Sequence, residues 1–220
     1  MNNKICIVVP FRDRDQHLEI FAPKMTEYLQ KTGVEGDILI VEQEQGKPFN
    51  RAKLLNVGFH YGNENCTYTH FCFHDVDMIP VESDYEYCDT PTHLAAKAQQ
   101  FNYALPYENY FGGVTIFDVA SFKKINGYSN DYCGWGAEDD DVFNRCQIMG
   151  ISTKRKPGVY ESLQHDRIIP PNLYHENVSR LKNMNSKFDG EKFTEGLSTL
   201  DFELQSTHPS EKYMKIKVKI

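Results

Sequence analysis

Residues 5–9, Ile-Cys-Ile-Val-Val, decide the fold class of this chain. An unbroken apolar run of this length is typical of a strand that is buried on both faces of a parallel sheet. Pro10 is expected to end the strand, because proline cannot donate a hydrogen bond to a neighbouring strand. Residues 11–14, Phe-Arg-Asp-Arg, then form a loop at the carboxyl end of the strand.

The segments that follow alternate between helical and strand patterns. Four apolar side chains share one face of a first helix that closes near Gly33, namely Leu18, Phe21, Met25 and Leu29. A strand is predicted over residues 37–42, a helix over residues 51–59 and a strand over residues 70–74. This order predicts an α/β fold with a mostly parallel central sheet, flanking helices and right-handed crossovers.

Ligands of such sheets bind outside the carboxyl ends of the strands. Three polar segments are expected at that edge: residues 11–14, the turn at residues 49–51 and residues 75–77. The topology alone therefore predicts a ligand site there.

The second part of the chain is less regular. Residues 84–91 are expected to be irregular, residues 103–113 form an aromatic loop, and residues 114–117 form a strand. Asp118 can cap a short helix that Gly127 stops. The remaining expectations are a strand and connection over residues 151–160, a mobile polar loop over about residues 161–184 that leads into a helix, and edge strands at residues 200–204 and 214–220.

Composition narrows the function classes. The length of 220 residues suits one domain, and the net charge of −7 argues against a nucleic-acid or anionic-membrane partner. The six cysteines lack the spacing of metal sites and are expected to be reduced. The chain starts at Met1 without a signal peptide or an apolar run that could span a bilayer, so a cytoplasmic location is expected.

Residues 133–141, Cys-Gly-Trp-Gly-Ala-Glu-Asp-Asp-Asp, place the only tryptophan beside four consecutive carboxylates. One interpretation is the start of a helix that runs to Met149, because acidic residues in a first turn are stabilised by the helix dipole. A helix start leaves Trp135 unexplained. A flat apolar ring, flexible glycines and carboxylates together favour a sugar-binding site.

Asp75-Val76-Asp77 follows a buried strand and is a candidate metal site. Carboxylate oxygens with a nucleotide diphosphate are a common setting for Mn²⁺ or Mg²⁺, although aspartates also satisfy loop amides in plain turns. His165 could complete a Mn²⁺ site with Asp77. Three arginines at the same edge could neutralise phosphate or orient acids, namely Arg12, Arg14 and Arg51.

Seven blocks of the sequence resemble the β-1,4-galactosyltransferase family and occur in the family's order. They are residues 9–14 (Val-Pro-Phe-Arg-Asp-Arg), 49–59, 73–80 (Phe-His-Asp-Val-Asp-Met-Ile-Pro), 110–114, 126–130, 134–141 and 195–200. The resemblance implies a single-domain nucleotide-sugar (GT-A) fold over residues 1–220. It implies a nucleotide-binding half over about residues 1–80 and an acceptor-binding half over about residues 81–220. The implied reaction is Mn²⁺-dependent, inverting transfer of galactose from UDP-galactose to an acceptor sugar in a β-1,4 linkage.

The resemblance also implies roles for individual residues. Donor binding falls to Pro10, Phe11, Arg12, Arg14, Phe49, Arg51, Asp75, Val76, Tyr110, Gly113 and Trp135. Acceptor binding falls to Tyr107, Trp135, Gly136, Glu138 and Asp140. Asp77 and His165 would bind the metal, and Asp139 matches the catalytic base. Tyr110 matches a tyrosine that disfavours N-acetylated donors, which favours UDP-galactose.

Some positions depart from the family pattern. The family usually supplies a second metal ligand just before the loop histidine, and Ser162, Leu163 and Gln164 do not provide one. Cys133 stands where the family has tryptophan, and Ala137 where it has glycine. The membrane anchor and stem of animal members are absent, which resembles a soluble bacterial version that serves polysaccharide biosynthesis.

Three alternatives stay open at this stage. The donor could be UDP-N-acetylgalactosamine, or the chain could be a non-catalytic carbohydrate-binding module that leaves residues 75–77 and the arginines unused. A glycosidase would need two carboxylates that face each other across a cleft, which the adjacent Glu138 and Asp139 do not obviously provide. N-acetylglucosamine, glucose and xylose all fit as the acceptor, alone or within an oligosaccharide or glycolipid.

Overall fold

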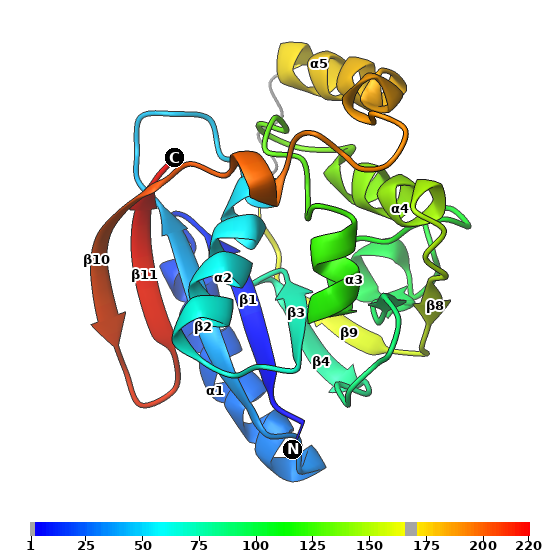
Figure 1. Ribbon diagram of the computed structural model, residues 1–220. Helices are drawn as coiled ribbons and strands as arrows, with labels where there is room; N and C mark the ends of the chain where they lie inside the picture. Colours follow the sequence, from blue (N-terminus) through cyan, green and yellow to red (C-terminus); the bar gives the residue numbers. More distant parts are fainter. Residues whose placement is uncertain (1–2, 166–170) are drawn as a thin grey trace.

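The computed structural model describes residues 3–165 and 171–220, built around an eight-stranded sheet (Figure 1). From edge to edge the strands are β10 (Glu203–Pro209), β11 (Met214–Lys219), β2 (Gly36–Gln43), β1 (Ile5–Phe11), β3 (His70–His74), β7 (Val114–Asp118), β5 (Thr92–His93) and β8 (Lys154–Arg155). A second sheet has the order β4 (Met78–Glu82), β9 (Val159–Ser162) and β6 (Lys97–Ala98).

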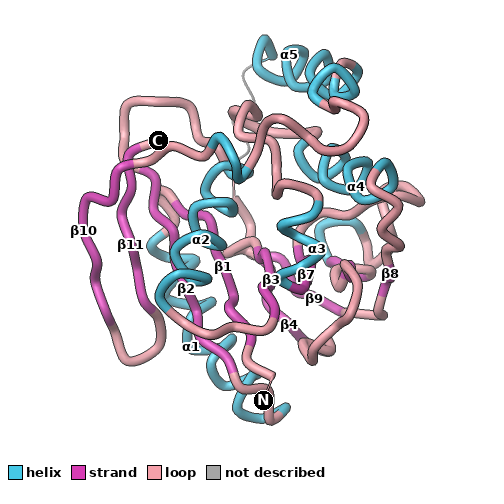
Figure 2. The backbone as a smooth tube through the Cα atoms, in the orientation of Figure 1, coloured by secondary structure: helices cyan, strands magenta, loops and turns pink. Residues whose placement is uncertain are grey.

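Helices surround these sheets (Figure 2). They are α1 (Asp15–Thr32), α2 (Arg51–Asn65), α3 (Val119–Lys124), α4 (Glu138–Ile148) and α5 (Pro171–Lys182), with 3₁₀ turns η1 (Gln99–Phe101), η2 (Met184–Lys187) and η3 (Leu197–Thr199). Across the described ranges, no helix combines the length and the apolar character that a membrane crossing requires. The expected cytoplasmic location stays a prediction.

The centre of the sheet is parallel. β1 pairs in parallel with both β2 and β3, and β11 pairs in parallel with β2. All seven residues of β1 are buried, because alternate side chains enter two separate cores. Ile7 and Val9 pack with α1, whereas Cys6 and Val8 pack with α2. The predicted α/β fold class is confirmed.

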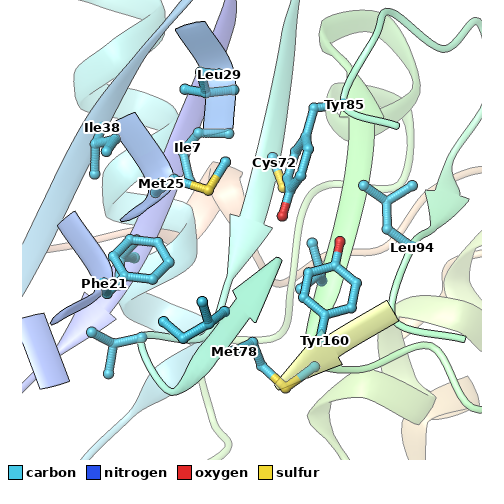
Figure 3. Close-up of a cluster of buried hydrophobic side chains, with 14 of the residues drawn as sticks. Ile7, Phe21, Met25, Leu29, Ile38, Cys72, Met78, Tyr85, Leu94 and Tyr160 are labelled. Atoms are coloured by element: carbon cyan, nitrogen blue, oxygen red, sulfur yellow. The ribbon is translucent and has the colours of Figure 1, made fainter. Parts of the chain in front are cut away.

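The core beneath α1 joins the two sheets (Figure 3). Phe21 and Met25 of α1 pack into the same cluster as Tyr160 of β9 and Met78 of β4. Each large apolar side chain that is fully buried stabilises the fold by about 1.5–3 kcal/mol. The small sheet is therefore packed onto the first half of the chain, and the molecule is one domain.

Several predicted boundaries were wrong. β1 continues through Pro10 to Phe11, because its pairing with β3 ends at Val8 and the missing N–H of Pro10 interrupts no bond on that side. α2 extends past residue 59 to Asn65, and the strands of the small sheet were not all expected. Of the two strands predicted as edge strands near the end of the chain, β10 lies at an edge of the sheet but β11 does not, because β11 lies between β10 and β2.

The carboxyl ends of β1, β2 and β3 meet the amino end of the antiparallel strand β7. The backbone N–H of Asp75, just after β3, donates to the carbonyl oxygen of Gly113, just before β7, over 3.0 Å. Residues 75–77 therefore lie beside the aromatic loop, at the edge where the topology predicted a ligand site.

Candidate active site

Arg51 connects three acidic side chains at this edge. It begins α2, whose N-cap is Asn50, a side chain that accepts a hydrogen bond from the backbone of Lys53. Arg51 Nε donates to Asp75 Oδ1 over 2.7 Å, and Nη1 donates to Asp139 Oδ1 over 2.8 Å. Glu138 Oε1 lies 3.5 Å from the same Nη1. One guanidinium thus fixes the end of β3 against the start of α4.

The carboxyl group of Asp139 is held in an unusual setting. Burial raises its pKa well above the usual aspartate value, against the opposing effect of Arg51, and Glu138 and Asp75 raise it further. Burial also raises the pKa of Glu138. A carboxyl group with a raised pKa is better matched to taking a proton near neutral pH. Asp139 is therefore equipped to act as a general base.

Gly112 leaves the space that the carboxylate of Asp139 occupies. A Cβ atom at position 112 would collide with Asp139 Oδ2 and would lie 2.7 Å from the hydroxyl oxygen of Tyr110. The family resemblance covered residues 110–114, but the reason for glycine at 112 emerges only from the fold. Asp139, Tyr110 and Gly112 together form one wall of the site.

Tyr107 and Asp140 lie on the outer side of this wall. The hydroxyl of Tyr107 donates to Asp140 Oδ1 over 2.8 Å, and the Tyr107 ring meets that of Tyr110 edge-on at 5.5 Å. Tyr107 is 46% exposed. These two predicted acceptor residues are brought together at the surface, next to Asp139.

Asp77 and His165 come together although 88 positions separate them in sequence. His165 Nε2 lies 3.1 Å from Asp77 Oδ2, and Arg14 Nη2 lies 3.1 Å from His165 Nδ1. A guanidinium can only donate, so Nδ1 accepts and Nε2 carries the proton that is donated to Asp77. A metal on Nε2 needs the opposite tautomer, so metal binding would break the contact with Arg14.

The donor set fits a divalent metal only in part. A carboxylate and an imidazole suit Mn²⁺, but within residues 3–165 and 171–220 no cluster of three His, Cys, Asp or Glu side chains could hold a metal. Ser162 accepts from the backbone of Gln100, and Leu163 packs into the core beneath α1. The absence of a second ligand from residues 162–164 stays a prediction.

His17 is a site residue that the sequence did not single out. Its Nε2 lies 3.2 Å from the carbonyl oxygen of Gln164, and its ring centroid lies 5.9 Å from that of His165. Its Nδ1 is buried and finds no hydrogen-bond partner among residues 3–165 and 171–220. The helical periodicity of α1 concealed this role, because His17 lies next to the core position Leu18. His17 supports the segment that carries His165.

The other residues that the sequence predicts for donor binding lie along the same edge. The guanidinium of Arg12 lies 5.3 Å from the ring centroid of Phe49, and its Nη1 donates to the carbonyl oxygen of Lys47 over 2.8 Å. Pro10 and Phe11 are buried at the end of β1, and Val76 is buried in the turn after β3. The carbonyl oxygen of Gly113 accepts from the backbone N–H of Asp75. The three arginines therefore share the edge but not a common partner.

We call residues 133–137 the tryptophan loop. Gly134, Gly136 and Ala137 all have positive φ angles, of 77°, 98° and 77°. Left-handed backbone suits glycine and strains alanine, so Ala137 is the strained member of the loop. Trp135 is 47% exposed, and its ring stacks on Tyr174 of α5 with centroids 5.8 Å apart. The loop ends where α4 begins, which confirms the predicted helix start.

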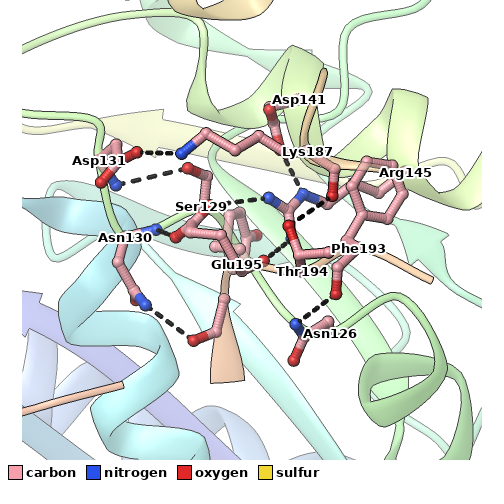
Figure 4. Close-up of polar contacts among 12 residues, drawn as sticks. Asn126, Ser129, Asn130, Asp131, Asp141, Arg145, Lys187, Phe193, Thr194 and Glu195 are labelled. Atoms are coloured by element: carbon pink, nitrogen blue, oxygen red, sulfur yellow. Dashed lines mark hydrogen bonds and ion pairs between the residues drawn. The ribbon is translucent and has the colours of Figure 1, made fainter. Parts of the chain in front are cut away.

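Asp141, the fourth carboxylate of the run, belongs to a buried polar network (Figure 4). It accepts from Arg145 Nε over 2.6 Å and from the hydroxyl of Tyr132 over 3.0 Å. Arg145 is 1% exposed and also contacts Glu195 Oε2, at 3.1 Å, and the ring of Phe193. This network attaches the first turn of α4 to the segment before η3, which explains why residues 195–200 form a block.

Comparisons with known proteins add independent findings. A family model described as the N-terminal region of glycosyl transferase group 7 matches residues 1–89. A second model, described as the N-terminal domain of galactosyltransferase, matches residues 92–167. The two matches together cover the strands and loops that form the site.

Individual relatives agree. Beta-1,4-galactosyltransferase 2 of Cricetulus griseus is 37% identical over 194 residues, which cover 84% of this chain and 53% of the relative. Human beta-1,4-galactosyltransferase 6 is 42% identical over 168 residues, which cover 74% of this chain and 44% of the relative. The chain spans about half the length of these curated relatives.

Solved structures show the same fold. The catalytic domain of Drosophila beta1,4-galactosyltransferase 7 in complex with xylobiose aligns with a TM-score of 0.80 at 29% identity, over 100% of this chain and 94% of that chain. A mutant of that enzyme in complex with manganese, UDP-Gal and xylobiose aligns with a TM-score of 0.81 at 28% identity, with the same coverage.

Proposed function

The chain belongs to the β-1,4-galactosyltransferase family, and from that membership we propose that it is an inverting galactosyltransferase that uses UDP-galactose. The acceptor is a hydroxyl group of a sugar, alone or in an oligosaccharide or glycolipid, and the product linkage is β-1,4. The observation that carries the proposal is the position of Asp139. Its buried carboxyl group lies 2.8 Å from Arg51 at the edge that also holds the Asp77–His165 pair.

Asp139 is proposed to remove the proton from the attacking hydroxyl. Arg51 orients its carboxylate through Oδ1, and Oδ2 lies against Gly112. General base catalysis by a positioned group contributes roughly 10²–10⁴-fold to rate. Tyr107 and Asp140, which are hydrogen-bonded to each other beside this group, are proposed to hold the acceptor with Glu138, Trp135 and Gly136.

Asp77 and His165 are proposed to hold Mn²⁺, or Mg²⁺ in its place. The bound metal would supply positive charge against the diphosphate that leaves. Arg12, Arg14, Phe49 and the end of β1 lie on the same side and are proposed to hold the nucleotide. The manganese and UDP-Gal in the Drosophila complex are properties of that enzyme and agree with this assignment.

The site is proposed to divide between two parts of one domain. Residues 1–80 hold the nucleotide, and residues 81–220 hold the acceptor. Part of the loop expected to move, residues 161–184, lies outside the described residues, at positions 166–170.

Tyr110 favours UDP-galactose over UDP-N-acetylgalactosamine. Its ring is held edge-on by His93 at 5.4 Å, by Phe101 at 5.5 Å and by Tyr107 at 5.5 Å. A ring fixed on three sides cannot move aside for an N-acetyl group, so its volume limits the donor.

The non-catalytic and glycosidase alternatives are less well supported. A binding module gains nothing from a buried carboxyl group with a raised pKa beside an arginine. A glycosidase needs two carboxyl groups about 5–9.5 Å apart on opposite sides of the bond, whereas Glu138 and Asp139 both lie against Arg51.

A UDP-release assay with UDP-galactose, Mn²⁺ and a panel of N-acetylglucosamine, glucose and xylose tests the proposal. We expect acceptor-dependent UDP release that a chelator abolishes. Absence of both Mn²⁺-dependent UDP binding and UDP release on every acceptor of the panel would instead favour the binding module.

A further inference from the structure

One fully buried polar side chain joins α5 to the tryptophan loop. Asn177 is 0% exposed, and its Nδ2 donates to the carbonyl oxygen of Cys133 over 2.9 Å and to that of Trp135 over 3.3 Å. Its Oδ1 accepts from Arg180 Nη1 over 3.1 Å. The Asn177 amide nitrogen therefore donates two hydrogen bonds to the tryptophan loop, and the amide oxygen accepts one from a side chain of the same helix.

The apolar contacts of α5 reach the same loop. A Cβ atom on Gly134 would lie 3.2 Å from Leu173, and one on Gly136 would lie 3.3 Å from the ring of Tyr174. Leu173 lies four positions before Asn177 and Tyr174 lies three positions before it, so both side chains share a face of the helix with Asn177. The backbone of the loop and this helix face are therefore in close contact.

The rest of the α5 interface is incompletely filled. A cavity of about 170 Å³ lies beside it, lined by Ser129, Tyr132, Asp141, Ser179 and Asn183 among others. In Figure 1, α5 lies at the periphery of the molecule, away from the central sheet. The strip formed by Leu173, Tyr174 and Asn177 therefore holds α5 together with the contacts that the helix makes with α4.

We propose that Asn177 is a positioning residue for the acceptor, which holds the tryptophan loop and α5 as one unit. The loop leads directly into Glu138, so its conformation also sets where the first turn of α4 presents its carboxylates. The carbonyl group of Ala137 accepts from the backbone N–H of Asp141 at the start of α4, whereas those of Cys133 and Trp135 accept from Asn177 on another helix. The inference rests on the proposed function for its kinetic consequences, but the loop contact does not depend on that function.

The amide group is required for a specific reason. Asn177→Asp keeps the shape and the Oδ1 contact with Arg180 but replaces the donor by an oxygen that faces two carbonyl oxygens. Asn177→Leu keeps the approximate volume and leaves the two carbonyl groups unpaired. Asn183→Asp is the matched control, because Asn183 is exposed just after the end of α5 and its side chain donates to the carbonyl oxygen of Ser179 rather than to the tryptophan loop.

The single tryptophan allows a direct measurement. Trp135 is the only source of tryptophan fluorescence in this chain, so acrylamide quenching reports the exposure of the loop itself. In the full chain we expect Asn177→Asp to raise the quenching constant about twofold and Asn183→Asp to leave it unchanged, because the lost donor faces only this loop.

Steady-state kinetics separate positioning from a general structural role. On the sugar of the panel that wild type uses best, we expect Asn177→Asp to raise the acceptor KM about tenfold, consistent with two lost hydrogen bonds. The affinity for UDP with Mn²⁺, measured by calorimetry, should stay within about twofold, because Asn177 bonds the backbone of Trp135 and not Arg12, Arg14 or Phe49, which are proposed to hold the nucleotide. Unchanged quenching and unchanged acceptor KM in Asn177→Asp would overturn the proposal.

Two further variants keep the proposal testable if Asn177→Asp does not fold. Asn177→Leu and Tyr174→Ala should show the same changes in quenching and acceptor KM with a normal thermal unfolding transition, and wild-type values in both would overturn the proposal. If no acceptor supports transfer by wild type, the proposed function fails, and quenching alone then decides whether Asn177 holds the loop.

Discussion

Arg51 Nη1 lies 2.8 Å from Asp139 Oδ1, and this ion pair joins the first turn of α2 to the first turn of α4. Both side chains are mostly buried, with 12% and 20% of their surface exposed. Arg51 also bonds Asp75 at the end of β3, so three elements that are distant in sequence meet at one guanidinium. The site is therefore assembled by tertiary contacts around a cation rather than by a local motif.

Removal of this cation should shift the pH dependence of the reaction. Arg51 lowers the pKa of Asp139 against the effect of burial, so Arg51→Met should raise that pKa further. A base must be ionised to act, so the acidic limb of the profile of kcat/KM should move to higher pH, with a loss of roughly 10²-fold at neutral pH. An acidic limb at the wild-type position would contradict the assigned ion pair.

The buried network around Arg145 should determine stability. Arg145→Met removes the charged partner of Asp141 and Glu195 and leaves them with neutral hydrogen bonds from Tyr132 and from the backbone of Asn130. The loss of one member of a buried pair costs about 3–5 kcal/mol. Urea unfolding measures this cost. The control Lys187→Met removes an exposed ion pair with Asp131 and should change the free energy of unfolding by about 0–1 kcal/mol.

His17 should affect metal binding without contacting the metal. His17→Phe keeps a ring against His165 but removes the contact with the carbonyl oxygen of Gln164. Loss of an outer-shell partner typically costs about 10–100-fold in metal affinity, which calorimetry with Mn²⁺ and UDP would detect. His60→Phe, an exposed site on α2, is the control, and equal affinities for the two variants would exclude this role.

Tyr110 should control the choice of donor. Tyr110→Leu removes the ring that three neighbouring rings hold in place, which opens space beside Gly112. The variant should use UDP-N-acetylgalactosamine at a rate that approaches its rate with UDP-galactose, in parallel assays at equal donor concentration. A variant that still rejects the N-acetylated donor would show that another group limits the pocket.

Local patterns predicted the elements that position the site. The apolar run at residues 5–9, the helix face that begins at Leu18 and the strand before Asp75 are each set by residues close in sequence. The edge shared by residues 11–14 and 75–77 followed from parallel topology. The pairing of Asp77 with His165 was also expected from the family resemblance.

Contacts between segments that are distant in sequence could not be predicted from local patterns. His17, Arg145 and Asn177 each gain their role from a partner that another part of the chain supplies, at Gln164, Glu195 and the tryptophan loop respectively. The alternation of polar and apolar residues over 214–220 predicted a strand but not its place inside the sheet. That place depends on which strand the hairpin of β10 and β11 pairs with.

Transfer by Asp139→Asn tests the central claim most directly. Asparagine keeps the size of the side chain but cannot accept the proton, so UDP release with acceptor should fall by roughly 10²–10⁴-fold, while UDP and Mn²⁺ bind as in wild type. Asp131→Asn, an exposed site outside the wall, should retain full activity. An Asp139→Asn enzyme that turns over at a rate near that of wild type would show that another group removes the proton.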